Sequence, residues 1–369
     1  MRSRKWALLA ALATVVAALA VVGCGGDDDE TAAEDLTPVT LQSKWVVQAQ
    51  FAGYYAAVDQ GFYEDEGLDV TIRAGGPDIV PEQVVAGGQA EFGINWFDSL
   101  LATRGQGQDL VNIAQVFTRS GMTEITWADT GLDDITKLEG KKVGVWLGGN
   151  EHKLFAALTK NGLDPQDDVD IVAQPFTMDL FLNREVEAAA AMTYNELAQV
   201  LEVENPDTGE LYTEEDLNVF KMSDLGTGAL EDGIFVRGDW IADEANQDIA
   251  KRFLKASFRG WIYCRDNPDS CVDIVLENGP TLGAGHQAWM MNEINALIWP
   301  APLGIGVMDP ASFDVTNQIA TDYGIIKEPA TEDAYRTDLA EAALAELEDE
   351  DTTGEDWEKP DVEVTPGGE

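Results

Sequence analysis

The feature that most constrains the fold is a regular alternation of short strand patterns with short helix patterns. In residues 38–117, apolar and polar residues alternate within short runs, as they do in half-buried strands, and helical patterns separate these runs. The expected strands are residues 39–45, 68–72, 90–95 and 111–117. Because strands that alternate with helices form mostly parallel sheets covered by helices, the sequence predicts an α/β fold.

A second α/β unit follows, and the chain then returns to the first. Strand patterns cover residues 141–146, 169–172 and 188–192, and we expect the strand at residues 233–237 to rejoin the first sheet. Long helical patterns follow it at residues 241–265, 272–277, 288–298 and 310–323. About 345 residues are too many for one simple core, so we predict two lobes. The first would hold residues 38–130 and 233–340, and the second residues 131–232.

The N-terminus has the pattern of an export signal. Basic residues at positions 2, 4 and 5 precede an uncharged, mostly Ala, Val and Leu run at residues 6–22. The run ends in Val-Val-Gly-Cys, which resembles the lipobox of bacterial lipoproteins and makes Cys24 the expected lipid-bearing residue. We expect residues 1–23 to be a signal peptide, residues 24–37 an acidic tether, and the protein to be lipid-anchored on the extracytoplasmic face of the cell membrane. A permanent transmembrane span, which needs about 20 apolar residues, is the alternative.

The charge of the chain excludes some partners. It carries 68 acidic and 23 basic residues, a formal net charge of −45. Nucleic acids and anionic lipid surfaces both require clustered Lys and Arg, so neither is an expected partner. Residues 341–369 hold 12 acidic residues and one Lys, and on composition we expect this tail to be disordered.

Two further cysteines, Cys264 and Cys271, flank an Asn-Pro-Asp sequence that is typical of a turn. Two nearby thiols of an exported protein usually pair, so we predict a disulfide between them. Two unpaired thiols on adjacent helix ends are the alternative. No metal site is expected, because His152 and His286 are the only histidines and neither is near these cysteines.

Several short segments of the chain together form a distinctive pattern. They are residues 45–57 (WVVQAQFAGYYAA), 61–70 (GFYEDEGLDV), 75–76 (GG), 85–93 (VAGGQAEFG) and 138–146 (LEGKKVGVW). They resemble the type II periplasmic-binding-protein family that includes binders of thiamine pyrimidine precursors, riboflavin, nitrate, taurine and alkanesulfonates. The resemblance implies two α/β lobes joined by two hinge crossings, a ligand in the cleft, and an ABC permease and ATPase as partners. No cofactor is expected, and we expect a monomer.

Candidate ligand-binding residues follow from a positional rule. In open α/β sheets, ligands lie beyond the carboxyl ends of strands, so binding side chains should follow strands directly. Aromatic, amide and acidic residues occupy such positions in both lobes. The candidates are Trp45, Gln48, Gln50, Tyr54, Trp96, Asp98, Trp146, Asn150, Glu151, Tyr194, Asn195, Glu196 and, just before the returning strand, Asp232. Rings that stack and a few polar groups suit a flat heterocycle.

Each candidate also has a plain structural alternative. Trp45 and Trp96 could be core residues, and Tyr54 competes with Tyr55 for the cleft. Asp98 and Glu196 could serve only to stabilise helix N-termini. The Gly148–Gly149–Asn150 turn before a helix could bind an anion, but Lys153 is the only basic residue close by, which favours a neutral or cationic ring. The Trp-Val-x-Gln-Ala-Gln segment and this turn look closest to those of riboflavin or thiamine-pyrimidine binders.

Other functions remain as alternatives. The family also includes a thiamine pyrimidine synthase with a Cys-rich iron motif and a Lys that holds pyridoxal phosphate. Here residues 146–151 contain no Cys, and no His follows Tyr54 and Tyr55, so we expect the chain not to be an enzyme. No Ser-His-Asp constellation, zinc spacing or phosphate loop is present. A nitrate, taurine or sulfonate binder and an extracellular ligand sensor are further alternatives.

Overall fold

The computed structural model describes residues 36–369. The predicted signal peptide, Cys24 and nearly all of the predicted tether lie in residues 1–35, outside the described residues. Within residues 36–369, no helix combines the length and the apolar character that a membrane crossing requires.

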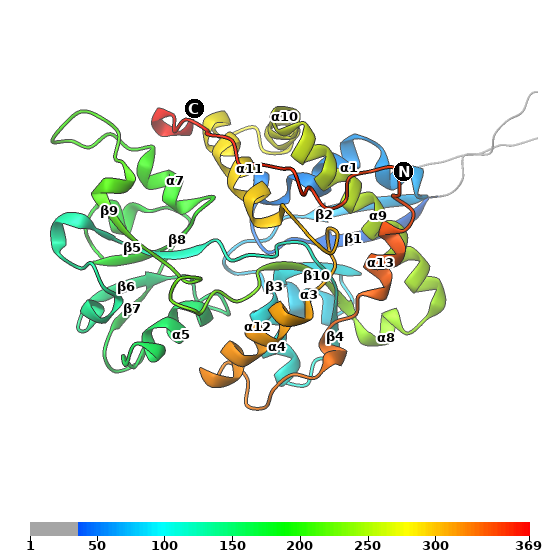
Figure 1. Ribbon diagram of the computed structural model, residues 1–369, viewed down its shortest axis with the longest axis horizontal. Coiled ribbons are helices and arrows are strands. Elements are labelled where there is room, and N and C mark those ends of the chain that lie inside the picture. Colours follow the sequence, from blue (N-terminus) through cyan, green and yellow to red (C-terminus); the bar gives the residue numbers. More distant parts are fainter. Residues whose placement is uncertain (1–35) are drawn as a thin grey trace, which may run out of the picture. The chain divides into compact units, whose positions relative to one another are not determined.

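The first lobe is built on a five-stranded sheet in the order β2-β1-β3-β10-β4 (Figure 1). Its strands are β1 (Thr37–Gln42), β2 (Leu68–Arg73), β3 (Phe92–Trp96), β4 (Leu110–Gln115) and β10 (Asp232–Arg237). The strands β1, β2 and β3 pair in parallel, whereas β10 runs antiparallel to both of its neighbours. The predicted return of the chain to this sheet is therefore confirmed.

The second lobe is built on a sheet in the order β7-β6-β8-β5-β9. Its strands are β5 (Met122–Trp127), β6 (Lys142–Val145), β7 (Asp170–Ala173), β8 (Ala188–Met192) and β9 (Leu217–Lys221). The strands β6, β7 and β8 pair in parallel, and β5 pairs antiparallel with β8 and β9. The predicted α/β fold with two sheets is thus confirmed.

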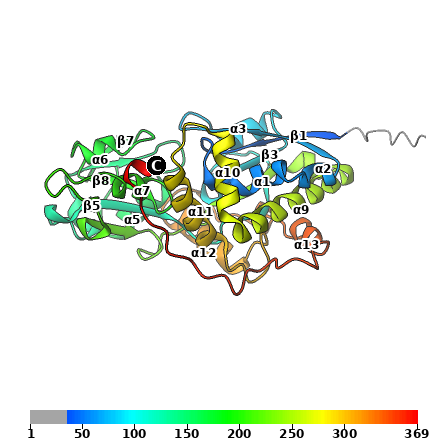
Figure 2. The same cartoon turned by 90° about the horizontal axis from the view of Figure 1, so that it is seen from above.

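Helices cover both sheets (Figures 1 and 2). The first lobe carries α1 (Ala52–Asp59), α2 (Phe62–Asp65), α3 (Pro81–Ala86), α4 (Phe97–Gly105), α8 (Gly238–Ile241), α9 (Glu244–Asp266), α10 (Pro268–Asn278), α11 (Ala284–Ile298), α12 (Pro310–Asp322) and α13 (Asp338–Leu344). The second carries α5 (His152–Lys160), α6 (Asp179–Leu182) and α7 (Glu196–Leu201). Short 3-10 turns are η1 (Ala49–Phe51), η2 (Ala128–Thr130), η3 (Ile135–Leu138), η4 (Glu214–Asp216), η5 (Glu332–Ala334) and η6 (Pro366–Gly368).

The long helix α9 lies unusually close to α1. A Cβ atom added to Gly260 would lie 1.9 Å from the carbonyl oxygen of Gly53. Only glycine at this crossing lets the two backbones meet, and the contact holds the segment after β1 against the rest of the first lobe. That segment supplies several side chains of the candidate site.

The boundary between the lobes needs correction. We expected the second lobe to begin at residue 131, but β5 already belongs to its sheet, so the first crossing lies before Met122. The strand was missed because every residue of β5 is buried, including the polar Thr123, Glu124 and Thr126. A strand whose polar side chains are also buried shows no alternation of apolar and polar residues.

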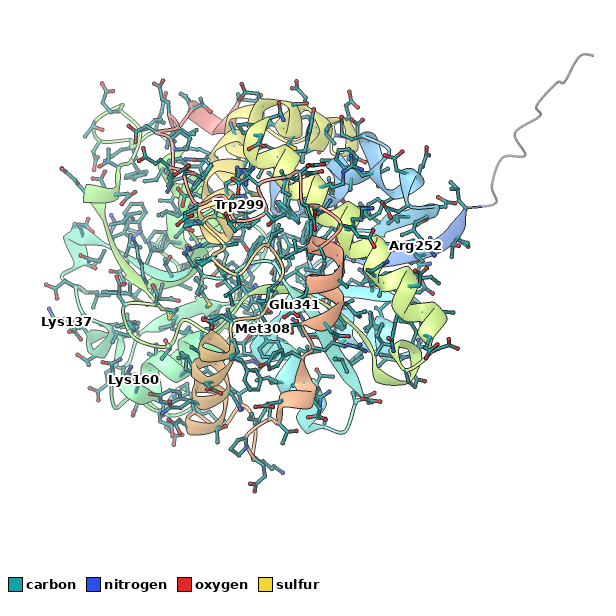
Figure 3. The ribbon with its side chains drawn as sticks, turned by 45° about the vertical axis from the view of Figure 1, so that its right-hand side comes forward. Lys137, Lys160, Arg252, Trp299, Met308 and Glu341 are labelled. Atoms are coloured by element: carbon teal, nitrogen blue, oxygen red, sulfur yellow. A yellow bond between two sulfur atoms is a disulfide. The ribbon has the colours of Figure 1, made fainter. Side chains whose placement is uncertain are left out.

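The expectation of a disordered tail also needs correction. Residues 341–369 continue from α13 along the protein surface toward α11 and α7 (Figure 2), and Trp357 packs against the main core. Arg265 donates a 2.7 Å hydrogen bond to the carbonyl of Asp351, and its guanidinium lies over the ring of Trp299, which Figure 3 labels. Lys359 pairs with Glu293. Composition could not predict these contacts, because only a few residues of the segment anchor it to the protein and most of the others are acidic.

The predicted disulfide is present. Cys264 lies near the end of α9 and Cys271 near the start of α10, with their Cα atoms 5.4 Å apart. The Asn267–Pro268 turn between the helices brings the two side chains together, as its sequence indicated.

Candidate ligand-binding site

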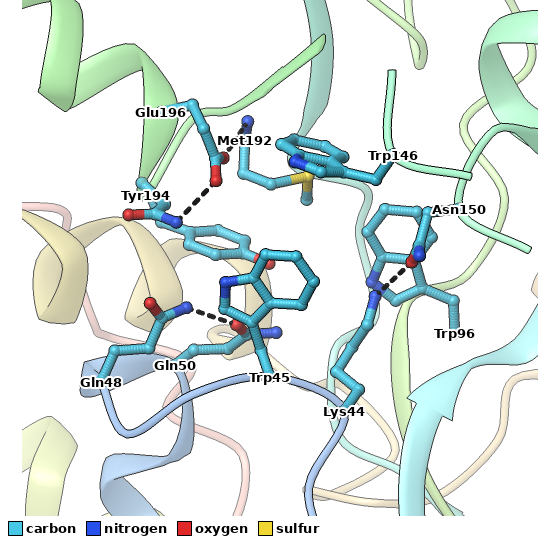
Figure 4. A pocket seen from close by; sticks show the side chains of 11 residues that line it. Lys44, Trp45, Gln48, Gln50, Trp96, Trp146, Asn150, Met192, Tyr194 and Glu196 are labelled. Carbon is cyan, nitrogen blue, oxygen red and sulfur yellow. Dashed lines mark hydrogen bonds between the residues drawn. The ribbon is translucent and has the colours of Figure 1, made fainter. Parts of the chain in front are cut away.

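The segments that follow β1, β3, β6 and β8 converge on one cavity between the two lobes (Figure 4). The empty space among their side chains is about 300 Å³, part of it open to solvent. The lining side chains are those of Lys44, Trp45, Gln48, Gln50, Trp96, Trp146, Asn150, Met192, Tyr194, Asn195 and Glu196. As the positional rule predicts, most of them follow the carboxyl end of a strand.

Tryptophans from both lobes form much of the cavity wall. Trp45 and Trp96 come from the first lobe and Trp146 from the second. The rings of Trp45 and Trp146 are 6.3 Å apart in an edge-on arrangement, and Trp45 also contacts Phe176 at 5.0 Å. The indole nitrogen of Trp146 donates to the carbonyl of Pro175 at 3.3 Å, which fixes the orientation of its ring. Aromatic faces held in this way can stack on a planar guest.

Lys44 places a cation in the cavity wall. Its ammonium group donates to Asn150 Oδ1 at 2.9 Å and lies 3.4 Å from the centroid of the Trp96 ring. Burial lowers the pKa of Lys44 to about 8, although Asp232 opposes this effect. The bond to Asn150 joins the two lobes, since Lys44 follows β1 and Asn150 follows β6.

Two amides line the first-lobe side, and a carboxylate behind them completes a hydrogen-bonded chain. Gln48 donates to Gln50 at 2.7 Å, and Gln50 donates to Asp232 Oδ2 at 2.8 Å. Burial raises the pKa of Asp232, while Lys44 and the Gln50 hydrogen bond act in the opposite direction. This chain sets the direction in which each amide faces the cavity.

Glu196 and Asn195 line the second-lobe side at the start of α7. The carboxylate of Glu196 accepts from the backbone N–H of Met192 at 3.0 Å and from Asn195 Nδ2 at 2.7 Å. Burial raises the pKa of Glu196 to about 7, and that of Tyr194 well above its ordinary value. Because the pKa of Glu196 lies near neutrality, its carboxyl can be offered to a ligand as either an acceptor or a donor.

Several predicted residues meet at this cavity. These are Trp45, Gln48, Gln50, Trp96, Trp146, Asn150, Tyr194, Asn195 and Glu196. Sequence reasoning missed Lys44 and Met192, although Lys44 directly precedes Trp45 and Met192 ends β8, so the positional rule covers both. The expectation of few basic residues near the site therefore needs correction, because Lys44 lines the cavity itself.

The other predicted residues lie outside the cavity. Tyr54 is buried in α1 with its ring 5.5 Å from that of Trp261, edge-on. Glu151 accepts from the backbone N–H of Gly149 at 2.8 Å and lines a different, larger cavity. Asp98 pairs with Lys153 at 3.5 Å, and Asp232 lies behind Gln50. These side chains support their neighbours instead of facing the cavity.

Direct contacts hold the two lobes together beside the cavity. The hydroxyl of Ser99 on α4 donates to the carbonyl of Gly149 at 2.7 Å. Lys153 on α5 is fully buried, with its ammonium group between the Asp98 carboxylate of α4 and the ring of Trp96, at 3.5 Å and 3.6 Å. Such contacts belong to a closed arrangement of the lobes, and they would break if the lobes moved apart.

Two α/β lobes that close on a cavity define a protein of the periplasmic-binding-protein fold. The solved structure of the alkanesulfonate-binding protein SsuA from Xanthomonas axonopodis pv. citri, bound to MOPS, matches with a TM-score of 0.61 and 13% identity. The match covers 82% of this chain and 99% of that one. The chain belongs to the NMT1/THI5-like family, whose model matches residues 48–271.

Named relatives of the chain include binding proteins and enzymes. A riboflavin-binding protein of Chloroflexus aurantiacus is 24% identical over 80% of this chain and 83% of that protein. A formylaminopyrimidine-binding protein of Halalkalibacterium halodurans is 23% identical over 70% and 77%, respectively. A 4-amino-5-hydroxymethyl-2-methylpyrimidine phosphate synthase of Candida albicans is 24% identical over 62% and 68%.

Proposed function

We propose that this chain is the extracytoplasmic solute-binding protein of an ABC importer and that it captures a flat heterocyclic nutrient, riboflavin or a thiamine pyrimidine precursor. One observation carries the proposal: Trp45 and Trp96 of the first lobe and Trp146 of the second line a single cavity. The similarity to a riboflavin-binding and a formylaminopyrimidine-binding protein supports the same class of ligand.

The polar groups of the cavity suit a nitrogen heterocycle. Such rings present donors and acceptors at their edge, in the plane of the ring, and stack through the two faces above and below that plane. Gln50, Asn150 and Glu196 supply amide and carboxyl groups on different sides of the cavity. An analogue that lacks one ring donor or acceptor would leave one of these groups unpaired, at a cost of about 1–3 kcal/mol.

Capture would work by closure of the two lobes. A ligand that contacts both lobes stabilises the closed state by the difference in its affinity for the closed and open states. The chain crosses between the lobes twice, between β4 and β5 and between β9 and β10, and these crossings are the proposed hinges. The closed protein would then present one combined surface to the permease and ATPase.

The anchor and location are part of the same proposal. Lipidation at Cys24 would hold the protein at the extracytoplasmic face of the membrane, next to its permease, with residues 24–37 as a tether. The disulfide between Cys264 and Cys271 supports an oxidising compartment outside the cytoplasm.

The thiamine pyrimidine synthase remains a second candidate because such enzymes are similar to this chain. Residues 146–151 contain no Cys for the iron motif that the synthases carry, which argues against that chemistry. Pyridoxal absorbance or bound iron in the purified protein would favour the enzyme.

Isothermal titration calorimetry tests the proposed ligand class. The soluble protein from residue 25 onward would be titrated with riboflavin, formylaminopyrimidine, nitrate and taurine. We expect a ring compound to bind and to raise the free energy of unfolding by about 2.7 kcal/mol at a concentration 100 times its Kd. Trp146→Leu should weaken ring binding by tenfold or more, whereas Trp240→Leu, in a first-lobe helix away from the cavity, should not. Binding of nitrate or taurine alone would overturn the proposal.

A further inference from the structure

A second, larger cavity adjoins the tryptophan-lined one. It contains about 860 Å³ of empty space, part of it open to solvent. Trp45, Gln48 and Asn195 line both cavities, so the two spaces are neighbours at these side chains. The second cavity extends from there toward the end of α7, the start of α11 and the C-terminal turn, which lie beside one another in Figures 1 and 2.

The walls of this second cavity combine apolar side chains, among them Val46, Phe176 and Leu282, with several polar ones. Gln199, Glu202, His286 and Gln287 contribute amide, carboxylate and imidazole groups in addition to the shared Gln48 and Asn195. No Lys or Arg is among the described residues that line it. Such a wall offers donors and acceptors in similar numbers but no cation for a strong anion.

Two of these amides have an Nε2 group that is free to donate a hydrogen bond to a ligand. Gln287 is almost fully buried, and its Oε1 accepts from the backbone N–H of Ala49 at 2.7 Å. Its Nε2 donates to no group within residues 36–369. Gln199 Nε2 makes only long contacts, 3.4 Å to the carbonyl of Phe176 and 3.3 Å to Asn195 Oδ1, so it can turn toward a better partner.

His286 and Glu202 keep the far wall rigid. The imidazole Nδ1 lies 2.8 Å from Glu202 Oε1, and Nε2 lies 2.9 Å from Asn195 Oδ1. The backbone N–H of Gly367 donates to the carbonyl of Glu202 at 2.9 Å, which closes the cavity with the end of the chain. The carboxylate of Glu202 gives this wall a negative charge that would repel a phosphate group.

We propose that the second cavity holds a flexible polyhydroxy chain attached to the ring that the tryptophans bind. This inference rests on the proposed function and selects, within it, a ring with a polyol chain over a single pyrimidine ring. The first cavity contains about 300 Å³ of empty space against about 860 Å³ in the second, so a longer ligand needs the adjoining space. Hydroxyl groups donate and accept, which matches a wall of amides and carboxylate without cations.

Calorimetry with three related probes tests the inference. Riboflavin carries a flat ring and a polyhydroxy chain, lumichrome carries the ring system without that chain, and flavin mononucleotide carries the chain with a terminal phosphate. We expect riboflavin to bind at least tenfold more tightly than either of the others. Gln199→Leu should weaken riboflavin binding roughly fivefold, the loss of about one hydrogen bond, and leave lumichrome binding unchanged. Gln318→Leu makes the same chemical change on the exposed face of α12 and should alter neither affinity.

The outcomes separate this inference from the proposed function. If riboflavin and lumichrome bind equally and Gln199→Leu has no effect, the polyol site is refuted while ring capture stands. Binding of formylaminopyrimidine without binding of riboflavin would likewise refute the polyol site and leave ring capture standing. Tight binding of flavin mononucleotide would refute the selection against phosphate. If no ring compound binds at all, the proposed function itself fails.

Discussion

Replacing the buried Lys44 by Met should stabilise the unliganded protein at neutral pH. Burial lowers the pKa of Lys44 from 10.5 to about 8 in the folded state. A lowering of this size means that the charged side chain costs the folded state about 3 kcal/mol at pH 7. Methionine has nearly the same length without the charge. It loses the hydrogen bond to Asn150, worth about 1 kcal/mol, so the expected net gain is about 2 kcal/mol.

The pH dependence gives this prediction a definite sign. Below pH 8 the lysine is charged in both the folded and the unfolded state, and the full cost is present. Between pH 8 and 10.5 the folded state has released its proton while the unfolded state still holds it, so the stability of the natural protein rises with pH. The advantage of Lys44→Met should therefore shrink from about 2 kcal/mol at pH 7 to about zero at pH 9.5.

Urea unfolding followed by circular dichroism at pH 7 and pH 9.5 measures this difference. Lys251→Met is the matched control, because Lys251 is a partly exposed side chain paired with Glu346 at 2.7 Å. Its substitution should change the free energy of unfolding by less than about 1 kcal/mol at either pH. A destabilised Lys44→Met protein at pH 7, or an advantage that does not shrink at higher pH, would refute the reasoning.

Three further predictions concern other parts of the molecule. Glu196→Gln should stabilise the unliganded protein above pH 7, because burial raises the pKa of Glu196 to about 7 and the charged carboxylate destabilises the folded state. This stabilisation should disappear as the pH falls toward 4.5, and urea unfolding across this pH range measures it. Trp357→Ala should lower the free energy of unfolding by about 1–2 kcal/mol, whereas an unpacked tail would show no change. Cys24→Ser should abolish labelling by radioactive palmitate in a bacterial host and release the protein from membranes, and continued labelling would contradict the anchor.

The sequence predicted the parts of the fold that follow a simple periodicity. The strands β2, β3, β4, β6 and β8 lie at or within a few residues of their expected positions, because each strand is apolar on one face or throughout. The strand β5 escaped detection since Thr123, Glu124 and Thr126 are buried within it. Burial of polar side chains depends on partners far away in the chain, such as β8 and β9, and no local pattern reports it.

The candidate site was predictable to the extent that strand ends determine it. Trp45, Trp146 and Asn195 follow strands, and the cavity lies where those strands end. Sequence position could not separate residues that face the cavity from those that support it. Asp98, for example, follows β3 directly but turns toward Lys153 of the other lobe, a contact that exists only once the two lobes meet.

The C-terminal turn has a consequence for how this molecule can be studied. Residues 338–361 lie along α9 and α11, whereas the backbone of Gly367 bonds to Glu202 just beyond α7, so the chain's end bridges the two lobes, as the two proposed hinges do. Any swing of the second lobe must detach this bond or drag the terminus with it. A purification tag fused after Glu369 would therefore hinder movement of the second lobe relative to the first. A fluorophore placed there would report that movement.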